Sequence, residues 1–571
     1  MPNFFTDNPD LSQHFKCLDI EYIVELKENY YIASKDNDAA PRNYEEAFDS
    51  YRIALDLLGE ICANDIAPRR QEIDAVGTRF IDGKVSYASG TESSRQQLSE
   101  LGFMGTIYPR EYGGLNFPAT IYMMMIEMVS RADPSLMTLF GYQDVGELIA
   151  RFGSEEQRQD FLPKLATGEH IGAIVLSEPG AGSDLQGIKL RAELDDEGNW
   201  HLNGIKHFIS NGCGDVLMVL ARSEPGDRNP FGLSLFACRG GKAVRVNRVE
   251  EKMGLHGSPT CELSFNQAPA QLVGSRRVGF TKYVLESLNQ ARFSVAAQAI
   301  GIAEAAYQLA NDYAKIRSQF GKLIGSFPAV ANLLFEARVK LESSRALVFE
   351  GAQWLDYKTQ LEEQIAELKQ KKQNFKQPHQ ALQKAALMVN LLSPMVKYIA
   401  TEAASQACHD AQQVFGGLGY MRETGIEQLV RDIRITTIYE GTSQVQVAAS
   451  LRLVMSDVLN EYFDEKHKSL VGDADAPLKV EIERIRCIFA DSLIHLKDKN
   501  DAKYNSACAQ HLVDMYGSIL ASYLLLGRVN FDDNHLVAAR YVKIALANAK
   551  ANNLIIKSNQ YDDLQQIKFT E

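Results

Sequence analysis

The feature that most constrains this 571-residue chain is its apolar periodicity, which changes twice along the sequence. From about residue 44 to 165, apolar residues recur at the spacing of amphipathic helices, as in EEAFDSYRIALDLLGEICANDIAP and ATIYMMMIEMVSRAD. From about 170 to 273 the pattern changes to short runs that are typical of strands, and from about 281 to 454 long helical patterns return. The sequence therefore predicts a mostly α-helical protein with a central β domain.

Six runs in the central region predict strands: IGAIVLS, IKLRAEL, NWHLNGIKHFI, VLMVLARS, GLSLFAC and CELSF. The segment DDEGNW joins the second run to the third and is typical of a hairpin connection. We expect five segments: an N-terminal extension at 1–44, a helical domain at 45–165, a middle β domain at 166–275, a helical-bundle domain at 276–454 and a helical extension at 455–571. Interfaces between such domains are favoured places for a ligand pocket.

Two further segments are distinctive. The polar stretch YKTQLEEQIAELKQKKQNFKQPHQ, near residues 356–380, carries Leu361, Ile365 and Leu368 on one helical face, so we interpret it as an exposed helix pair or an insertion. The apolar stretch from Met515 to Gly527 is too short to cross a bilayer and predicts a buried helix.

Composition excludes several classes of function. Hydrophobic residues make up 45% of the chain and charged residues 23%, which is typical of a globular protein. The formal net charge of −13 argues against binding to nucleic acid or to an anionic membrane, and we expect no stable membrane insertion. The eight cysteines form no CxxC pair and no metal-ligand spacing, so free thiols in a reducing compartment are expected. The first residues do not resemble a secretory signal, and we expect a cytoplasmic protein without a bound metal.

The first motif is LSEPGAGSDLQG. Gly180 and Gly182 allow a ligand to approach the backbone closely, and Ser177 and Ser183 supply hydroxyls. The motif lacks the spacing of a phosphate-binding P-loop. Taken alone, it is more typical of an ordinary turn after a strand than of a ligand site.

The next two motifs are GIKHFISNG and YAKIRSQFGKLIGSFP. In the first, a planar cofactor could rest its face against Phe208 and its polar edge against Ser210, although an ordinary strand and turn would look the same. In the second, Arg317 lies near the predicted end of a helix, with Gly321 as the expected terminator. An arginine there can clamp a diphosphate or simply interact with the helix dipole.

The fourth motif is QQVFGGLGYMRETGIEQLVRDIRITTIYEGTSQVQ. Gly416, Gly417 and Gly419 interrupt a helix before a second one begins. Glu440 then stands directly before Gly441, where a carboxylate can face a ligand with little steric cover. Glutamates near helix starts are usually partners of the helix dipole, so the signal is weak in isolation.

In this order, the four motifs closely resemble those of the acyl-CoA dehydrogenase family, and EKMGLHGSPTCEL is a fifth match. The likeness runs from about Glu45 to Val454 and is greatest to longer bacterial members with a C-terminal helical extension. It implies an N-terminal helical domain, a β-barrel-like middle domain, a C-terminal four-helix domain and an FAD cofactor.

The resemblance also implies roles for individual residues. It assigns FAD contacts to Ser177, Phe208, Ser210, Arg317, Gln319, Phe320, Gln413, Gly416, Gly417, Thr442 and Gln444. It assigns substrate contacts to Ser183, Arg292 and Gly441. In the family, the groups at 317–320 and 413–417 reach FAD across a subunit interface, which implies a homo-oligomer. We prefer a dimer because the extension at 455–571 could cap the surface that shorter members use to form tetramers; a tetramer remains an alternative.

By the same resemblance, Glu440 in YEGT is the general base that takes the α-proton of an acyl-CoA thioester. The implied reaction sends the β-hydride to FAD, gives a trans-2-enoyl-CoA and passes electrons to an electron-transfer flavoprotein. In the family, the backbone N–H of the base residue and the ribityl 2′-hydroxyl of FAD stabilise the enolate that develops. Ala291 occupies the region where isovaleryl-type members place their base, so no carboxylate stands there.

Two alternatives stay open at this point. An acyl-CoA oxidase on the same fold would use dioxygen, and a flavin-free acyl-CoA-binding protein would have lost catalysis. Ile174 stands where many members have an aromatic residue, and serine replaces threonine at 177 and 210, but neither departure removes a chemical role. The length and branching of the acyl chain are not readable from the sequence.

Overall fold

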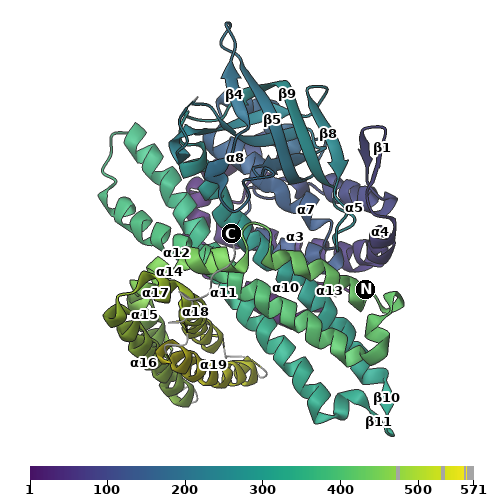
Figure 1. Cartoon of the computed structure of the whole chain (residues 1–571), viewed down its shortest axis with the longest axis vertical. Helices are drawn as coiled ribbons and strands as arrows, with labels where there is room; N and C mark the ends of the chain where they lie inside the picture. The colour runs from purple at the N-terminus through teal and green to yellow at the C-terminus, as the bar shows by residue number, and fades with distance from the viewer. Residues whose placement is uncertain (225, 471–475, 529–533, 559–560, 562–571) are drawn as a thin grey trace. The chain divides into compact units, whose positions relative to one another are not determined.

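The computed structural model describes residues 1–224, 226–470, 476–528, 534–558 and 561 (Figure 1). The chain divides into two compact units. The first unit comprises residues 1–12, 20–305 and 421–435, and the second comprises 13–19, 306–420 and 436–571. Parts of the expected C-terminal extension, at 471–475, 529–533, 559–560 and 562–571, lie outside the described residues.

Nine helices among the described residues lie wholly in the first unit. They are α2 (Glu21–Lys27), α3 (Tyr44–Ile61), α4 (Arg70–Val76), α5 (Ser89–Glu100), α6 (Ala119–Ala132), α7 (Met137–Phe140), α8 (Asp144–Phe152), α9 (Glu155–Ala166) and α13 (Ile426–Ile433). Helices α1 (Pro9–Lys16) and α10 (Leu285–Ile316) each contain the point in the sequence where the division falls. The two helical runs quoted from the sequence correspond to α3 and α6, so both predictions are confirmed.

The first unit also holds the main sheet, drawn around β4, β5, β8 and β9 in Figure 1. Its strands are β3 (Gly172–Val175), β4 (Arg191–Leu194), β5 (Trp200–Ser210), β6 (Val216–Arg222), β7 (Leu233–Arg239), β8 (Val244–Val249) and β9 (Thr260–Leu272); β1 (Arg79–Ile81) and β2 (Lys84–Ser86) form a separate hairpin. The order β6-β4-β5-β9-β7 closes on itself because β7 also pairs with β6. The middle region is therefore a small closed barrel, with β3 and β8 added at its margins.

Strand β6 contributes to two hydrophobic cores, one shared with the helices and one inside the barrel. Side chains alternate between the two faces of a strand. Met218 and Leu220 pack with Val145 of α8 on one face, whereas Leu217 and Val219 lie in the barrel interior. Because both faces are buried, the strand reads as a continuous apolar run instead of an alternating one.

The six predicted strand runs all contain strands, and β4 and β5 form the expected hairpin. Strand β8 was not among the predicted strands, although its segment VRVNRV alternates apolar and polar residues as a half-buried strand does. All eight cysteines are free thiols, as expected.

In the second unit, the long helices α11 (Pro328–Gln370) and α12 (Lys376–Phe415) pack along each other. The polar segment near 356–380 forms the ends of these two helices and the turn between them, so the expectation of a helix pair is confirmed. Leu361 and Ile365 are buried, and Leu368 is half-buried. The two-residue strands β10 (Ser318–Gln319) and β11 (Lys322–Leu323) also lie in this unit and form a hairpin between α10 and α11.

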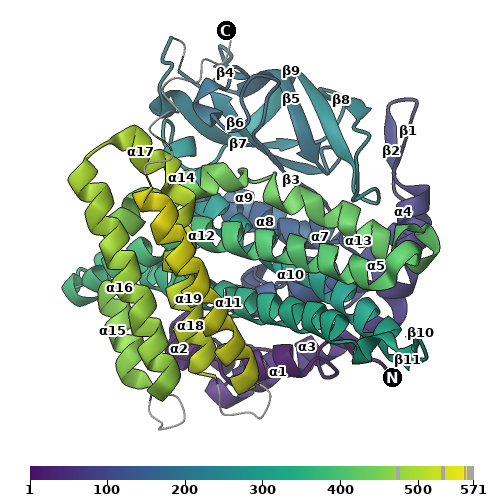
Figure 2. The same cartoon turned by 60° about the horizontal axis from the view of Figure 1, so that its bottom comes forward.

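The C-terminal part of the second unit is helical (Figure 2). It contains α14 (Ser443–Met455), α15 (Asn460–Ser469), α16 (Ala476–Lys499), α17 (Ala502–Ala507), α18 (Ala509–Leu526) and α19 (Asn534–Lys557). Helix α18 packs against α11, α14, α16 and α19, and most of its residues are buried. The buried helix predicted near Met515 is therefore confirmed. Within the described ranges, no helix has both the length and the apolar character needed to cross a membrane.

Candidate functional site

The loop that follows β3 carries Ser177 and Ser183 and is attached to β5 by a buried ion pair. Lys206 is fully buried; its Nζ lies 3.0 Å from a carboxylate oxygen of Glu178 and donates to the carbonyl of Leu176 at 2.7 Å. The Glu178 carboxylate also accepts the backbone N–H groups of residues 189 and 190, at 2.7 and 2.9 Å. Burial lowers the pKa of Lys206 to about 8, and Glu178 partly opposes that shift. Ser177 is half-buried and Ser183 is exposed.

Phe208 lies at an irregularity of β5, where the pairing with β9 shifts register between Lys206 and Ile209. Its φ of +60° is in the left-handed region, which is uncommon for an aromatic residue. This conformation leaves the ring 62% exposed within the chain. Non-glycine residues in this region cluster at functional sites, where the surrounding structure holds them. The backbone N–H of His207 donates to the carbonyl of Ser177 at 2.9 Å, so the structure brings the first and second motifs together.

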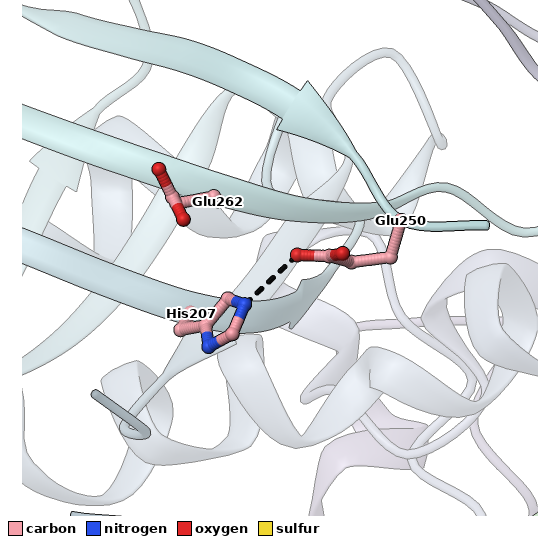
Figure 3. Close-up of side chains that lie close together, drawn as sticks. All are labelled: His207, Glu250 and Glu262. Carbon is pink, nitrogen blue, oxygen red and sulfur yellow. Dashed lines mark hydrogen bonds and ion pairs between the residues drawn. The ribbon is translucent and has the colours of Figure 1, made fainter. Parts of the chain in front are cut away.

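His207 belongs to a charged cluster with Glu250 and Glu262 (Figure 3). Its ring stacks on that of Phe208 with centroids 3.7 Å apart, and its Nε2 lies 2.9 Å from Glu250. His207, Glu250 and Glu262 place one possible metal-ligand atom each within 4.8 Å of one another. Arg248 lies among them, at 3.1 Å from Glu250 and 3.4 Å from Glu262. Because this guanidinium compensates the two carboxylates, we interpret the cluster as an ion-pair network that supports the strand.

Arg292, expected at the substrate, lies on α10 and is half-buried. Its guanidinium donates to the side-chain oxygen of the buried Asn289 at 3.3 Å. Ala291 is half-buried on the same helix.

The motif around Arg317 forms the β10–β11 hairpin of the second unit. Gly321 does not terminate the preceding helix, and this prediction was wrong: α10 ends at Ile316, and Phe320 and Gly321 form the two-residue turn of the hairpin. Their φ values of +51° and +75° suit the tight turn type that such hairpins prefer. Arg317 is exposed, and the Phe320 ring is 93% exposed. The hairpin therefore presents a cation and an uncovered aromatic ring.

The glycine turn after α12 lies beside the base of this hairpin. The rings of Tyr313, near the end of α10, and Phe415, the last residue of α12, stack with centroids 4.4 Å apart. Gly416 follows with a φ of +60°, and both it and Gly417 are exposed. Gln413 is exposed as well. The structure thus brings the third motif and the start of the fourth together within the second unit.

Glu440 lies three residues before α14 in a turn with an unusual backbone. Its φ is +54°, and that of Gly441 is +96°. Thr442 is the N-cap of α14, and its side chain accepts the N–H of Val445. Glu440 is half-buried, and Gln444 is exposed on the first turn of the helix. A left-handed glutamate ahead of a capped helix is a conformation that the neighbouring residues must maintain.

Side chains from α12 and α14 hold this turn. Lys397 of α12 is fully buried and donates to the carbonyl of Gly441 at 2.7 Å. Gln446 of α14 donates to the carbonyls of Glu440 and Gly441 at 2.8 and 3.1 Å. Ser443 donates to the carboxylate of Glu402 on α12 at 2.5 Å. These bonds hold the peptide units that join Glu440 to Gly441 and Gly441 to Thr442.

The residues that hold the motifs in place were not predicted from the sequence. Lys206 and Lys397 are the most informative, since each is a lysine within an apolar run, in GIKHFI and SPMVKYIA. A cation at such a position is rarely buried without a partner. The sequence therefore indicates that each lysine has a buried partner, but it does not identify that partner.

Several of the motif residues suit a planar, phosphate-bearing cofactor such as FAD. A Cβ added at Gly180 or Gly182 would meet no atom within 4 Å, and neither glycine has a positive φ. Neither packing nor backbone conformation therefore requires glycine there, which is consistent with a ligand approaching the loop. The exposed rings of Phe208 and Phe320 and the exposed guanidinium of Arg317 also suit such a group.

Comparison with known proteins shows the family. Sequence models of three acyl-CoA dehydrogenase domains match successive parts of the chain: the N-terminal domain at 50–169, the middle domain at 173–268 and the C-terminal domain at 279–377 and 376–455. The 3-methylmercaptopropionyl-CoA dehydrogenase of Ruegeria pomeroyi is 33% identical over 425 residues, which cover 70% of this chain and 69% of the relative. An acyl-CoA dehydrogenase of Bacillus subtilis is 34% identical over 371 residues, covering 64% and 88%.

Solved structures show the same fold. A Bacillus anthracis acyl-CoA dehydrogenase in complex with FAD aligns over 91% of this chain and 92% of its own, with a TM-score of 0.74 and 21% identity. A chain in the structure of an electron-transferring flavoprotein from Acidaminococcus fermentans aligns over 71% and 97%, with a TM-score of 0.60 and 31% identity. The chain therefore belongs to the acyl-CoA dehydrogenase family of flavin oxidoreductases, and its cofactor is FAD.

Proposed function

We propose that the protein oxidises an acyl-CoA thioester to the trans-2-enoyl-CoA, with Glu440 as the general base. The observation that supports Glu440 most directly is the turn around it. Gln446 binds the carbonyl of Glu440, and Lys397 and Gln446 both bind the carbonyl of Gly441. A base must be positioned to within hydrogen-bond reach of the proton that it removes. A side chain on a turn fixed in this way loses little freedom when the substrate binds.

The chemistry divides between the chain and the cofactor. When bound, FAD accepts the hydride that leaves the β-carbon. The carboxylate of Glu440 takes the α-proton, and the pair of electrons from the Cα–H bond forms the α,β double bond. The backbone N–H of Glu440 donates to the thioester carbonyl, which carries negative charge as the proton leaves. One donor of this kind contributes about 3–4 kcal/mol to transition-state stabilisation in comparable sites.

We propose roles for the other residues on the same basis. Ser177, Phe208 and Ser210 would contact the flavin ring, and Ser183, Arg292 and Gly441 the substrate. The residues on the hairpin and on the glycine turn after α12, with Thr442 and Gln444, would hold the remainder of FAD. Exposure of Arg317 and Phe320 within one chain is consistent with their serving a second subunit, so we propose a homo-oligomer and prefer a dimer.

We also propose that electrons pass to an electron-transfer flavoprotein and that the protein is cytoplasmic. The similarity to a chain in the structure of such a flavoprotein supports the first point. Stopped-flow reoxidation of the reduced, product-bound enzyme tests it: reoxidation that is slow with dioxygen and fast with the flavoprotein is expected. Fast reoxidation by dioxygen would instead indicate an oxidase.

The test of Glu440 is the Glu440→Gln variant, which keeps the size of the side chain and removes the base. We expect a fall in kcat of about 10²–10⁴-fold, the usual contribution of general-base catalysis, with FAD content and acyl-CoA binding retained. Glu423→Gln is the matched control because Glu423 is an exposed glutamate that precedes Glu440 in the same sequence motif. Bleaching of the flavin under anaerobic conditions, with short, medium, long, branched and cyclic acyl-CoAs, measures the rate and identifies the substrate. A near-normal rate for Glu440→Gln would refute the assignment.

A further inference from the structure

Asn211, the residue that follows β5, has an unusual backbone conformation. Its φ is +53°, and Phe208, two residues before the end of the strand, has a φ of +60°. A residue with a Cβ rarely adopts this left-handed conformation, and asparagine tolerates it better than most. Ser210, the last residue of β5, therefore lies between two left-handed residues.

Each polar group of Asn211 has a partner, and the residue is fully buried. Its backbone N–H donates to the carbonyl of Pro259 at 2.9 Å, and its carbonyl accepts the N–H of Gly214 at 2.8 Å. Its side-chain nitrogen donates to the carbonyl of Thr138 at 2.7 Å, and the hydroxyl of Tyr87 donates to its side-chain oxygen at 3.5 Å. A buried group that loses such a partner has no water to replace it, so these bonds hold the residue in its left-handed conformation.

The partner on α7 is itself held in place. Thr138 is buried, and its hydroxyl oxygen lies 2.9 Å from the carbonyl oxygen of Ser135 and 2.7 Å from the hydroxyl of Ser258. Lys252 donates to the carbonyl of Ser258 at 2.6 Å. The side chain of Asn211 therefore ties the end of β5 to a fixed point formed by α7 and the loop before β9.

We propose that Asn211 is a positioning residue that orients Ser210 towards the flavin. The inference rests on the proposed function, in which Ser210 contacts the flavin ring. Ser210 is paired with Thr260 on β9. Because the side chain and the carbonyl of Asn211 are anchored, a change in its φ must be taken up by the peptide unit that joins it to Ser210. Such a rotation would move Ser210 against its pairing with β9 and redirect its hydroxyl.

The first test compares two variants of Asn211. Asn211→Gly keeps access to the left-handed φ but removes the side-chain bond, whereas Asn211→Ala removes the bond and also disfavours the φ. Fluorescence titration of the FAD-free protein measures FAD affinity. Stopped-flow absorbance of the FAD-saturated protein measures flavin reduction by the acyl-CoA that reduces the wild-type protein fastest.

We expect affinity and reduction rate to fall at least about fivefold in Asn211→Gly, because the carbonyl of Thr138 loses its buried donor. Asn211→Ala should lose at least about a further fivefold because of the strained φ. The visible absorbance bands of the bound flavin should also shift, which a loss of stability alone does not cause. The Tm of the FAD-free protein shows whether each variant is folded, and Asn211→Gly carries the test if Asn211→Ala does not fold.

A double-mutant cycle tests whether Asn211 acts through Ser210. Independent substitutions have additive effects on free energy, whereas coupled ones do not. In a Ser210→Ala background, Asn211→Gly should therefore change the reduction rate by less than about twofold. Full additivity would overturn the inference while leaving the proposed role of Ser210 intact. If Ser210→Ala alone changes neither FAD affinity nor rate, the proposed flavin contact itself is wrong, and the inference falls with it.

Asn116→Gly is the matched control. Asn116 also has a left-handed φ, of +58°, and its side chain donates to the carbonyl of Lys27 at 3.4 Å. This variant should shift the Tm without changing FAD affinity, the flavin spectrum or the reduction rate. The inference is overturned if Asn211→Gly keeps wild-type values in all three measurements, or if Asn116→Gly changes them as much.

Discussion

Replacing Lys397 by methionine should slow the reaction without unfolding the protein. Lys397 is fully buried on α12, and its ammonium group donates to the carbonyl of Gly441 at 2.7 Å. Methionine fills a similar volume but cannot donate. The turn that carries Glu440 would then depend mainly on Gln446, which binds the same carbonyl at 3.1 Å.

The magnitude follows from the type of bond that is lost. A hydrogen bond from a charged donor contributes about 1.5–3 kcal/mol. If the turn must hold its shape only when the proton is transferred, that loss lowers kcat by roughly 10- to 150-fold. Stability should change less, because removing a buried charge also removes the cost of its desolvation. We expect Tm to shift by less than about 4 °C.

The assay is steady-state turnover with an artificial electron acceptor, read beside FAD content, substrate KM and Tm. Lys384→Met is the matched control: Lys384 lies on the same helix, and its ion pair with Glu465, at 3.1 Å, is exposed. Exposed pairs contribute about 0–1 kcal/mol, so this variant should keep its kcat. If Lys397→Met keeps normal kcat and FAD content, the buried lysine does not position the base. A loss of FAD together with a collapse of Tm would show a structural role instead.

Three further changes test neighbouring features. Gly441→Ala should lower kcat at least about tenfold, because a φ of +96° costs a residue with a Cβ about 1–2 kcal/mol and the new Cβ would lie 2.5 Å from Nε2 of Gln446. Stopped-flow flavin reduction measures the rate, and an unchanged rate would contradict this prediction. Phe208→Gly should weaken FAD binding in a fluorescence titration while leaving the Tm of the FAD-free protein unchanged or higher, since glycine relieves the left-handed φ; unchanged FAD affinity would show that the ring does not contact the cofactor. Burial raises the pKa of Asp432 to about 7, above its unfolded value, so the folded state holds the extra proton and stability is lost as pH rises from about 4 to 7. Asp432→Asn, which keeps an oxygen for the N–H of Leu255, should reduce this slope in Tm measured across that range, and an unchanged slope would exclude Asp432 as its source.

Much of the fold was predictable because its signals are local. The amphipathic spacing that predicts α3 and α6 and the six strand runs depend only on which face of an element is buried. The apolar run at α18 was likewise correctly assigned to a buried helix. Gly321 was misassigned because a glycine with positive φ ends a helix and turns a hairpin equally well, and only the pairing of residues 318–319 with 322–323 distinguishes the two.

The candidate site was likewise only partly predictable from the sequence. The order of the motifs, and their resemblance to one family, identified the positions where FAD contacts and a base are expected. The tertiary structure decided how those positions are held. Lys206 of β5 binds Glu178 in the loop that follows β3, and Lys397 of α12 binds the turn before α14. Such partners are far apart in the sequence, and a buried charge is stable only where the fold supplies a group that binds it. Periodicity can therefore indicate that a lysine is buried, but it cannot identify the group that the lysine binds.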